Sequence, residues 1–232
     1  MAIIPHSRLL FCFSILVTAA VFSGCVELIN ASGPTHSSEE IEYFLEIALG
    51  SEYGNNPELI VKWKEDIRVR VQGNPTAEDL EFLNRTIFDI NAIAGSQKLK
   101  LVETSPNMEI YFVPVSDFWL YETRYISRNF GFFSVKYDGT GSIYSGKVLI
   151  ASDRTTQEMR FHLIREEVTQ SLGLMQDSYR YEDSIFYQEY SNTTSYSDMD
   201  RTIIEMLFLD EIQPVMTGVE IELALNRAPE DA

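Results

Sequence analysis

The residues best able to do chemistry in this chain lie in one short run, Arg165-Glu166-Glu167-Val168-Thr169-Gln170-Ser171-Leu172-Gly173-Leu174. Glu166 and Gln170 are four residues apart, so on a helix they share one face. Two imidazoles at this spacing, with a glutamate beside the first, would hold zinc and deprotonate a zinc-bound water. Here Glu166 and Gln170 have this spacing in place of imidazoles, and Glu167 follows Glu166 directly. Gly173 and Gln176 come three and six residues after Gln170.

These side chains are a poor zinc set. One carboxylate and two amides would bind zinc weakly, because zinc prefers imidazole, thiolate or carboxylate ligands. Calcium prefers oxygen, but it takes about six to eight ligands and a stiff helical pair supplies few of them. We therefore expect no metal and no other cofactor.

The run resembles the H-E-x-x-H-x-x-G-x-x-H motif of metzincin peptidases, with Glu166, Gln170 and Gln176 in place of the three histidines. The resemblance implies that these three are vestigial ligand positions, that Glu167 is a vestigial general base and that Gly173 is the helix-ending turn. Downstream, Asp183-Ser-Ile-Phe-Tyr187 resembles the Met-turn of matrixins, and Phe186 stands at the methionine position. An acidic helix start at Asp198 and the later pair Leu207-Phe208 also match the matrixin pattern. The resemblance implies a zincin-like domain, a pseudo-metallopeptidase that keeps the scaffold without the zinc chemistry.

A closer resemblance is to the family known as domain of unknown function 2927, whose members resemble bacterial lipoproteins of unassigned activity with zincin-like folds. It rests on four segments of this chain: the motif run, Asp177-Ser178, Leu207–Asp210 and Pro214–Thr217. Members of that family also carry Glu and Gln where peptidases carry His, so the resemblance implies that the replacement is a family trait. Val215 departs from the glycine expected before Met-Thr.

Two neighbours of the motif allow alternative interpretations. His162 lies one turn before Glu166, so it could form a relocated metal or proton-transfer pair. It could also simply form an intrahelical hydrogen bond or remain a partly exposed helix histidine, and we favour this second interpretation. Arg165 could neutralise one of the two glutamates. Glu166 and Glu167 could act as a general acid and base only if both faced one cleft. Adjacent helix residues diverge by about 100°, so we expect that they do not.

The elements that position this run predict an α+β fold: a mixed twisted sheet, a long motif helix and a small helical C-terminal subdomain. Capping boxes are predicted at Thr76 with Asp79 and at Thr217 with Glu220. The resemblance to zincins implies that the strand at 130–137 is the antiparallel edge above the cleft. The aromatic segment 116–129 either packs into the core, which we favour, or lines a groove. The expected strands are 67–71, 99–102, 108–114, 130–137 and 143–152, and the expected helices are 38–50, 76–95 and 155–174, with two more starting at 197 and 217.

The N-terminus resembles a bacterial lipoprotein signal peptide over residues 1–24. A weakly basic start precedes the apolar run Leu9–Phe22, and Phe22-Ser-Gly-Cys25 resembles a lipobox. An ordinary signal peptide and a retained anchor are the alternatives. Cys12 would leave with the signal, so Cys25 would be the only cysteine of the mature chain. Lipidation would account for an unpaired cysteine in a secreted protein, and it predicts a membrane-anchored, extracytoplasmic protein.

We expect a tether at 25–37, a single domain at 38–228 with its subdomain boundary near Leu174, and a charged tail at 229–232. The net charge of −17 and the pI near 4.5 argue against nucleic acid as a partner. The predicted function is non-catalytic binding of a peptide or protein in the cleft. The alternative is an active metal-dependent peptidase with non-standard ligands and Glu167 as general base.

Overall fold

The computed structural model describes residues 36–50, 58–95, 98–125 and 129–226. These residues belong to one compact unit. The predicted signal peptide, Cys25 and the tail 229–232 lie outside the described residues. Within the described ranges, every helix is too short or too polar to span a membrane.

The central sheet is mixed, as predicted. Its strands are β1 (Lys62–Trp63), β2 (Ile67–Gly73), β3 (Leu99–Leu101), β4 (Met108–Val113), β5 (Gly131–Tyr137) and β6 (Ser142–Ala151). The parallel strands run in the order β1-β6-β4-β2-β3. β5 pairs antiparallel with β6, which confirms the expected antiparallel edge. The short strand β1 was not predicted, because two residues carry no periodicity.

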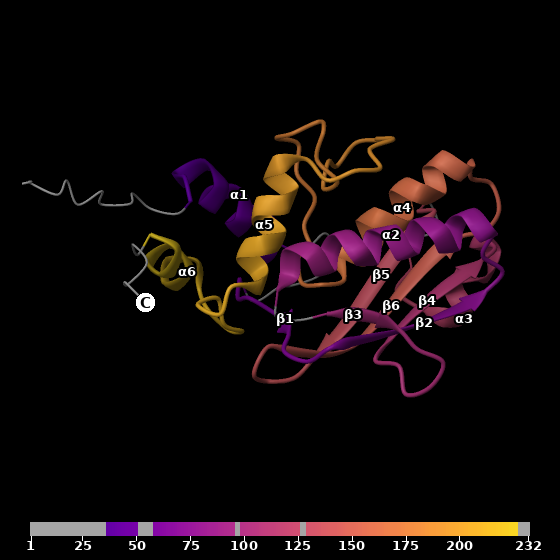
Figure 1. The fold of residues 1–232 in the computed structure, drawn as a ribbon, viewed down its shortest axis with the longest axis horizontal. Helices are drawn as coiled ribbons and strands as arrows, with labels where there is room; N and C mark the ends of the chain where they lie inside the picture. The colour runs from indigo at the N-terminus through magenta and orange to yellow at the C-terminus, as the bar shows by residue number, and fades with distance from the viewer. Residues whose placement is uncertain (1–35, 51–57, 96–97, 126–128, 227–232) are drawn as a thin grey trace, which may run out of the picture. The chain divides into compact units, whose positions relative to one another are not determined.

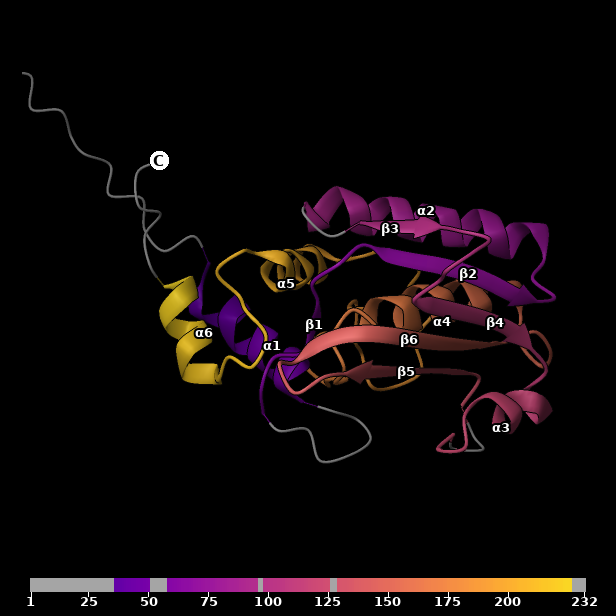
Figure 2. The same ribbon diagram turned by 90° about the horizontal axis from the view of Figure 1, so that it is seen from below.

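Helices α2 (Ala77–Ala94) and α4 (Gln157–Gln170) pack against each other across one face of the sheet (Figures 1 and 2). Side chains alternate between the two faces of a strand. Val148 and Ile150 of β6 therefore enter the main core under these helices, whereas Leu149 and Ala151 face the other side. On that side lie η1 (Val115–Asp117) and α3 (Phe118–Tyr121).

The aromatic segment after β4 closes this second, smaller core. Phe118 is fully buried among residues that include Phe132 and Leu149, and the ring of Tyr125 contacts the rings of both Phe118 and Phe132. Trp119 and Leu120 are exposed. These contacts favour the packing interpretation of the segment over the groove.

The remaining helices, α1 (Ser38–Leu49), α5 (Asp198–Phe208) and α6 (Gly218–Leu225), gather at one end of the sheet (Figure 1). The predicted capping boxes at Thr76 and Thr217 are both present. Ser197 caps α5 in the same way, and α1 is capped by Ser37, one residue before the predicted start. In each box a side-chain oxygen satisfies a backbone N–H that the helix leaves free.

The motif helix is shorter than predicted. α4 ends at Gln170, not near Leu174, and residues 171–173 form a turn. Gly173 has φ +126°, and a Cβ there would lie 2.2 Å from the carbonyl oxygen of Val61. The chain leaves the helix early because it must pass close to the backbone before β1, which only glycine permits.

Candidate functional site

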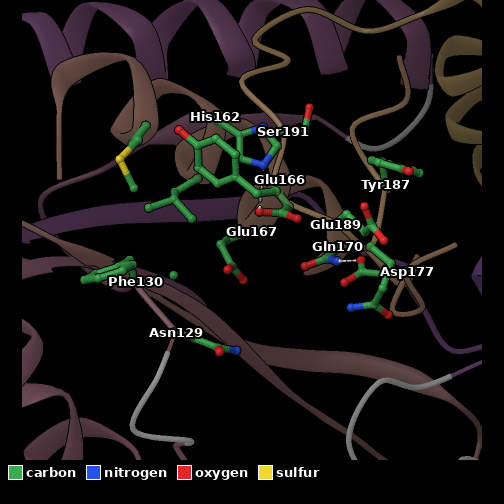
Figure 3. Close-up of a pocket in the computed structure, with 15 residues that line it drawn as sticks. Asn129, Phe130, His162, Glu166, Glu167, Gln170, Asp177, Tyr187, Glu189 and Ser191 are labelled. Carbon is green, nitrogen blue, oxygen red and sulfur yellow. Dashed lines mark hydrogen bonds and ion pairs between the residues drawn. The ribbon is translucent and has the colours of Figure 1, made fainter. Parts of the chain in front are cut away.

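A pocket of about 260 Å³ lies beside α4 (Figure 3). It is bounded by α4, by the start of β5, and by the segment that follows the motif. The lining residues are Asn129, Phe130, Gly131, Met159, His162, Leu163, Glu166, Glu167, Gln170, Asp177, Tyr187, Gln188, Glu189, Tyr190 and Ser191. We call residues 187–191, together with Thr193, the wall segment.

Glu166 and Glu167 both line this pocket, which corrects the expectation that adjacent helix residues would not face one cleft. The pocket spans two flanks of α4. On one flank Glu167 lies against β5, and on the other His162 and Gln170 contact residues that follow the helix. Because the pocket spans both flanks, it is lined by two neighbouring side chains whose directions differ by about 100° around the helix axis.

The general-base position is in close contact with the antiparallel edge. Glu167 is buried, and a Cβ added at Gly131 would lie 2.3 Å from its Oε1. Any side chain larger than hydrogen at the start of β5 would therefore push this carboxylate away. The close approach explains why a glycine begins this strand, and it places Glu167 where the edge strand meets the helix.

His162 has a partner at each ring nitrogen. Its Nδ1 is 2.7 Å from the carbonyl oxygen of Thr193, and its Nε2 is 3.3 Å from Oε2 of Glu166. Burial disfavours the charged ring, but the hydrogen bond and charge of Glu166, together with the Thr193 carbonyl, raise the pKa of His162 above its ordinary value. The intrahelical contact that we favoured is therefore present, with a second contact to the wall segment.

The other two vestigial ligand positions, Gln170 and Gln176, lie in different surroundings. The Gln170 side-chain amide donates to Oδ1 of Asp177 at 2.5 Å, inside the pocket (Figure 3). Gln176 does not line the pocket: its backbone N–H donates to the carbonyl of Ile47, and its side-chain amide donates to the Asp177 carbonyl. Asp177 thus occupies the place next to the expected third ligand. Sequence reasoning did not select it as a site residue, although an acid directly after Gln176 was a usable signal.

Arg165 and Phe186 lie away from the pocket. Nη2 of Arg165 donates to Oδ2 of Asp89 on α2 at 2.8 Å, and its guanidinium lies 4.3 Å from the ring centroid of Tyr196. Arg165 therefore pairs with Asp89 and does not neutralise Glu166 or Glu167. Phe186 is fully buried in the main core.

The pocket residues do not fit a zinc ion. Among the described residues, no three His, Cys, Asp or Glu side chains are grouped so that they could hold a metal. Both nitrogens of His162 have partners, and Gln170 offers an amide nitrogen to Asp177. Four carboxyl side chains but only one imidazole line the pocket, so its lining is acidic.

The fold and site define an α+β domain whose pocket lies between a helix and an antiparallel edge strand and has no metal-binding set in the described residues. The family described as "Protein of unknown function (DUF2927)" matches residues 37–227, and the chain belongs to this family.

Solved structures give weaker matches. One structure of myroilysin has 12% identity and a TM-score of 0.42, covering 65% of this chain and 83% of the other. A crystal structure of myroilysin has 11% identity and a TM-score of 0.44, covering 71% and 92%. At this level of similarity, neither match supports an argument about function. No protein with a curated description matches the chain.

Proposed function

We propose that this protein is a lipid-anchored, extracytoplasmic binding protein with a degenerate metallopeptidase-like domain. Its ligand is an extended segment of a peptide or protein, held in the pocket between α4 and β5. One observation carries the proposal. Polar side chains at and beside the vestigial ligand positions bind one another, while the pocket stays open beside an edge strand.

The engaged side chains argue against metal-dependent hydrolysis. A hydrolytic zinc site needs neutral imidazoles or carboxylates that point at the metal and leave one coordination position for water. His162 and Gln170 instead hold neighbouring protein groups. The arrangement supports a cleft that holds a ligand without cleaving it.

The edge strand supplies the means of binding. β5 pairs with β6 on one side, and within the described residues no strand pairs with its other side. The free edge of a strand offers backbone N–H and C=O groups to an added strand. Because Gly131 begins β5 and borders the pocket, an extended ligand along β5 would reach the pocket at that end. Peptide capture rests on this geometry, since a fold alone does not determine function.

The anchor is supported by sequence only. The run Phe22-Ser-Gly-Cys25 closes an apolar segment, and Cys25 would be unpaired in the mature chain. A lipid on Cys25 would hold the binding domain at the outer face of a membrane through a short tether.

The proposal can be tested by selecting displayed random peptides on the full-length protein. Selected peptides should lose at least about tenfold in affinity on Glu189→Lys, a change of charge at the pocket rim. Glu182→Lys is the matched control, because Glu182 is also exposed in the same loop but does not line the pocket. No selected peptide, or equal loss on both variants, would contradict binding in this pocket.

The shared pocket of Glu166 and Glu167 keeps an active hydrolase as the second candidate. Incubating the selected peptides with the protein and zinc, followed by mass spectrometry, separates the two. We expect intact peptides. Cleavage that is lost in Glu167→Gln would identify Glu167 as a working general base and replace the binding proposal.

A further inference from the structure

His162 is the side chain that joins α4 to the wall segment across the pocket. Its Nδ1 reaches the Thr193 carbonyl. Its Nε2 reaches the Glu166 carboxylate (Figure 3). The ring is buried except on the side that lines the pocket. Because of these two contacts, the protonation state of His162 affects the structure of the pocket.

Both partners of the ring can only accept a hydrogen bond. A backbone carbonyl and an ionised carboxylate have no proton to give, whereas an imidazolium has two N–H groups and a neutral imidazole has one. The structure as described therefore suits the protonated ring. When the ring loses a proton, one of the two contacts must be lost, because a lone pair would then face an acceptor.

We propose that the proton on His162 is a switch that controls Glu166. When the ring is charged, Glu166 is held along α4. When the ring is neutral, it keeps the Thr193 carbonyl, and the Glu166 carboxylate turns into the pocket as a free negative group. The switch regulates the pocket of the proposed function, so its meaning for ligand binding rests on that proposal.

Glu166 is the partner that is released, because its side chain can move more easily than the backbone carbonyl of Thr193. Glu166 is a flexible side chain at the pocket surface, so it can exchange His162 for pocket water by rotation alone. Thr193 contributes a backbone carbonyl, and its own N–H is bound to the Ser191 hydroxyl. Three residues further on, the Tyr196 hydroxyl is bonded to Thr169 of α4 at 2.6 Å. Moving the wall segment would disturb these contacts as well.

The charged groups around the His162 ring decide which of its protonation states is favoured. The charged and titratable groups that line the pocket with it are Glu166 and Glu167 from α4, Asp177 after the helix, and Tyr187, Glu189 and Tyr190 from the wall segment. No lysine or arginine lines the pocket, and β5 contributes no charged group there. The carboxylates favour the imidazolium against the opposing effect of burial. Glu166 should therefore be released as pH rises through the raised pKa of His162.

The test is a pH titration of the full-length protein by NMR, with histidine and glutamate labelled with carbon-13 and the backbone amides labelled with nitrogen-15. His6→Gln and His36→Gln variants assign the His162 signal, and Glu166→Gln assigns the Glu166 carboxyl signal. We expect the midpoint of the His162 titration to lie above the ordinary value for histidine, the Glu166 carboxyl signal to change with the same midpoint, and the Thr193 amide to change little. Glu166→Gln should lower the His162 midpoint.

A Glu166 signal that does not move through the His162 titration would overturn the switch, as would a Thr193 amide that moves in its place. The titration uses no ligand. If no peptide is ever found, the proposed function fails while the switch can still stand, and the converse also holds.

Discussion

At the scale of single residues, the pocket depends on close packing of the Glu167 carboxylate against Gly131. Because Gly131 has no side chain, the buried carboxylate of Glu167 can lie against the start of β5. A carboxylate this well enclosed can move only if its neighbours move too, because protein interiors are closely packed. The glycine is therefore part of the site, although it carries no functional group.

Gly131→Ala should destabilise the protein by about 1–3 kcal/mol, because the new methyl group would overlap with Glu167. Urea unfolding measures the change. Gly139→Ala is the matched control, since a Cβ there meets no atom within 4 Å, and we expect less than about 0.5 kcal/mol. Equal effects at the two positions would mean that the carboxylate moves away freely.

His162 should give the protein a pH-dependent stability. Its pKa is raised in the folded state, so its contribution is fully present below the unfolded pKa of about 6.5 and is lost as pH rises through the folded pKa. Unfolding curves of wild type and His162→Gln should therefore differ more at about pH 5.5 than at about pH 9. In a Glu166→Gln background the difference should shrink, because the carboxylate that raises the pKa of His162 is gone. A gap for His162→Gln that widens at high pH would contradict the assigned ion pair.

At the scale of elements, α4 makes contacts on two opposite flanks. One flank forms the pocket, and the opposite flank is fixed to α2 and to the loop before α5 by Arg165. Its guanidinium is bonded to Asp89 and also lies 5.3 Å from the ring centroid of Phe82. The cation is enclosed, so its partners set both the position and the rotation of the helix. The pocket geometry therefore depends on a residue that never touches the pocket.

Arg165→Ala should cost about 2–4 kcal/mol, because removing the buried Arg165 side chain leaves a cavity between α2 and α4, and the partly exposed Asp89 loses its partner. Thermal or urea unfolding reports the loss. Arg85→Ala is the control: Arg85 also lies near the Phe82 ring and forms an ion pair with Glu81, but it is exposed. We expect about 0–1 kcal/mol there. Similar costs for both variants would show that Arg165 does not fix the helix.

At the scale of the whole molecule, the chain combines an acidic domain with a predicted lipid anchor. A surface with net charge −17 would be repelled by anionic lipid, so membrane attachment would have to come from the lipid on Cys25. Lipid chains and a tether would keep the pocket near a membrane without requiring the domain to contact it. This prediction falls on a residue outside the described ranges.

In a bacterial host, cells fed a labelled fatty acid should incorporate it into the wild-type protein and should release a Cys25→Ala variant from the membrane fraction. A Cys12→Ala variant is the control, because Cys12 would be removed with the signal peptide, and it should behave as wild type. Unlabelled wild-type protein, or membrane-bound Cys25→Ala protein, would favour one of the two alternatives, an ordinary signal peptide or a retained anchor.

The sequence by itself determined most of the local structure. Alternating and helical periodicities located all the longer strands and helices, and the capping boxes at Thr76 and Thr217 located two helix starts. These features depend on neighbours within a few residues, which a single sequence displays directly. The antiparallel edge was predicted through the family resemblance, and the pairing of β5 with β6 confirms it.

Only the tertiary structure decided which side chains meet in the pocket. The early end of α4 follows from contact of Gly173 with Val61, more than a hundred residues away in sequence. The partners of Arg165, the entry of Asp177 and the exclusion of Gln176 likewise depend on elements that fold back from distant segments. Spacing along one helix predicts which residues share a face, but the width of a cleft is set by what packs opposite. For that reason Glu166 and Glu167 line one pocket although they are neighbours in sequence.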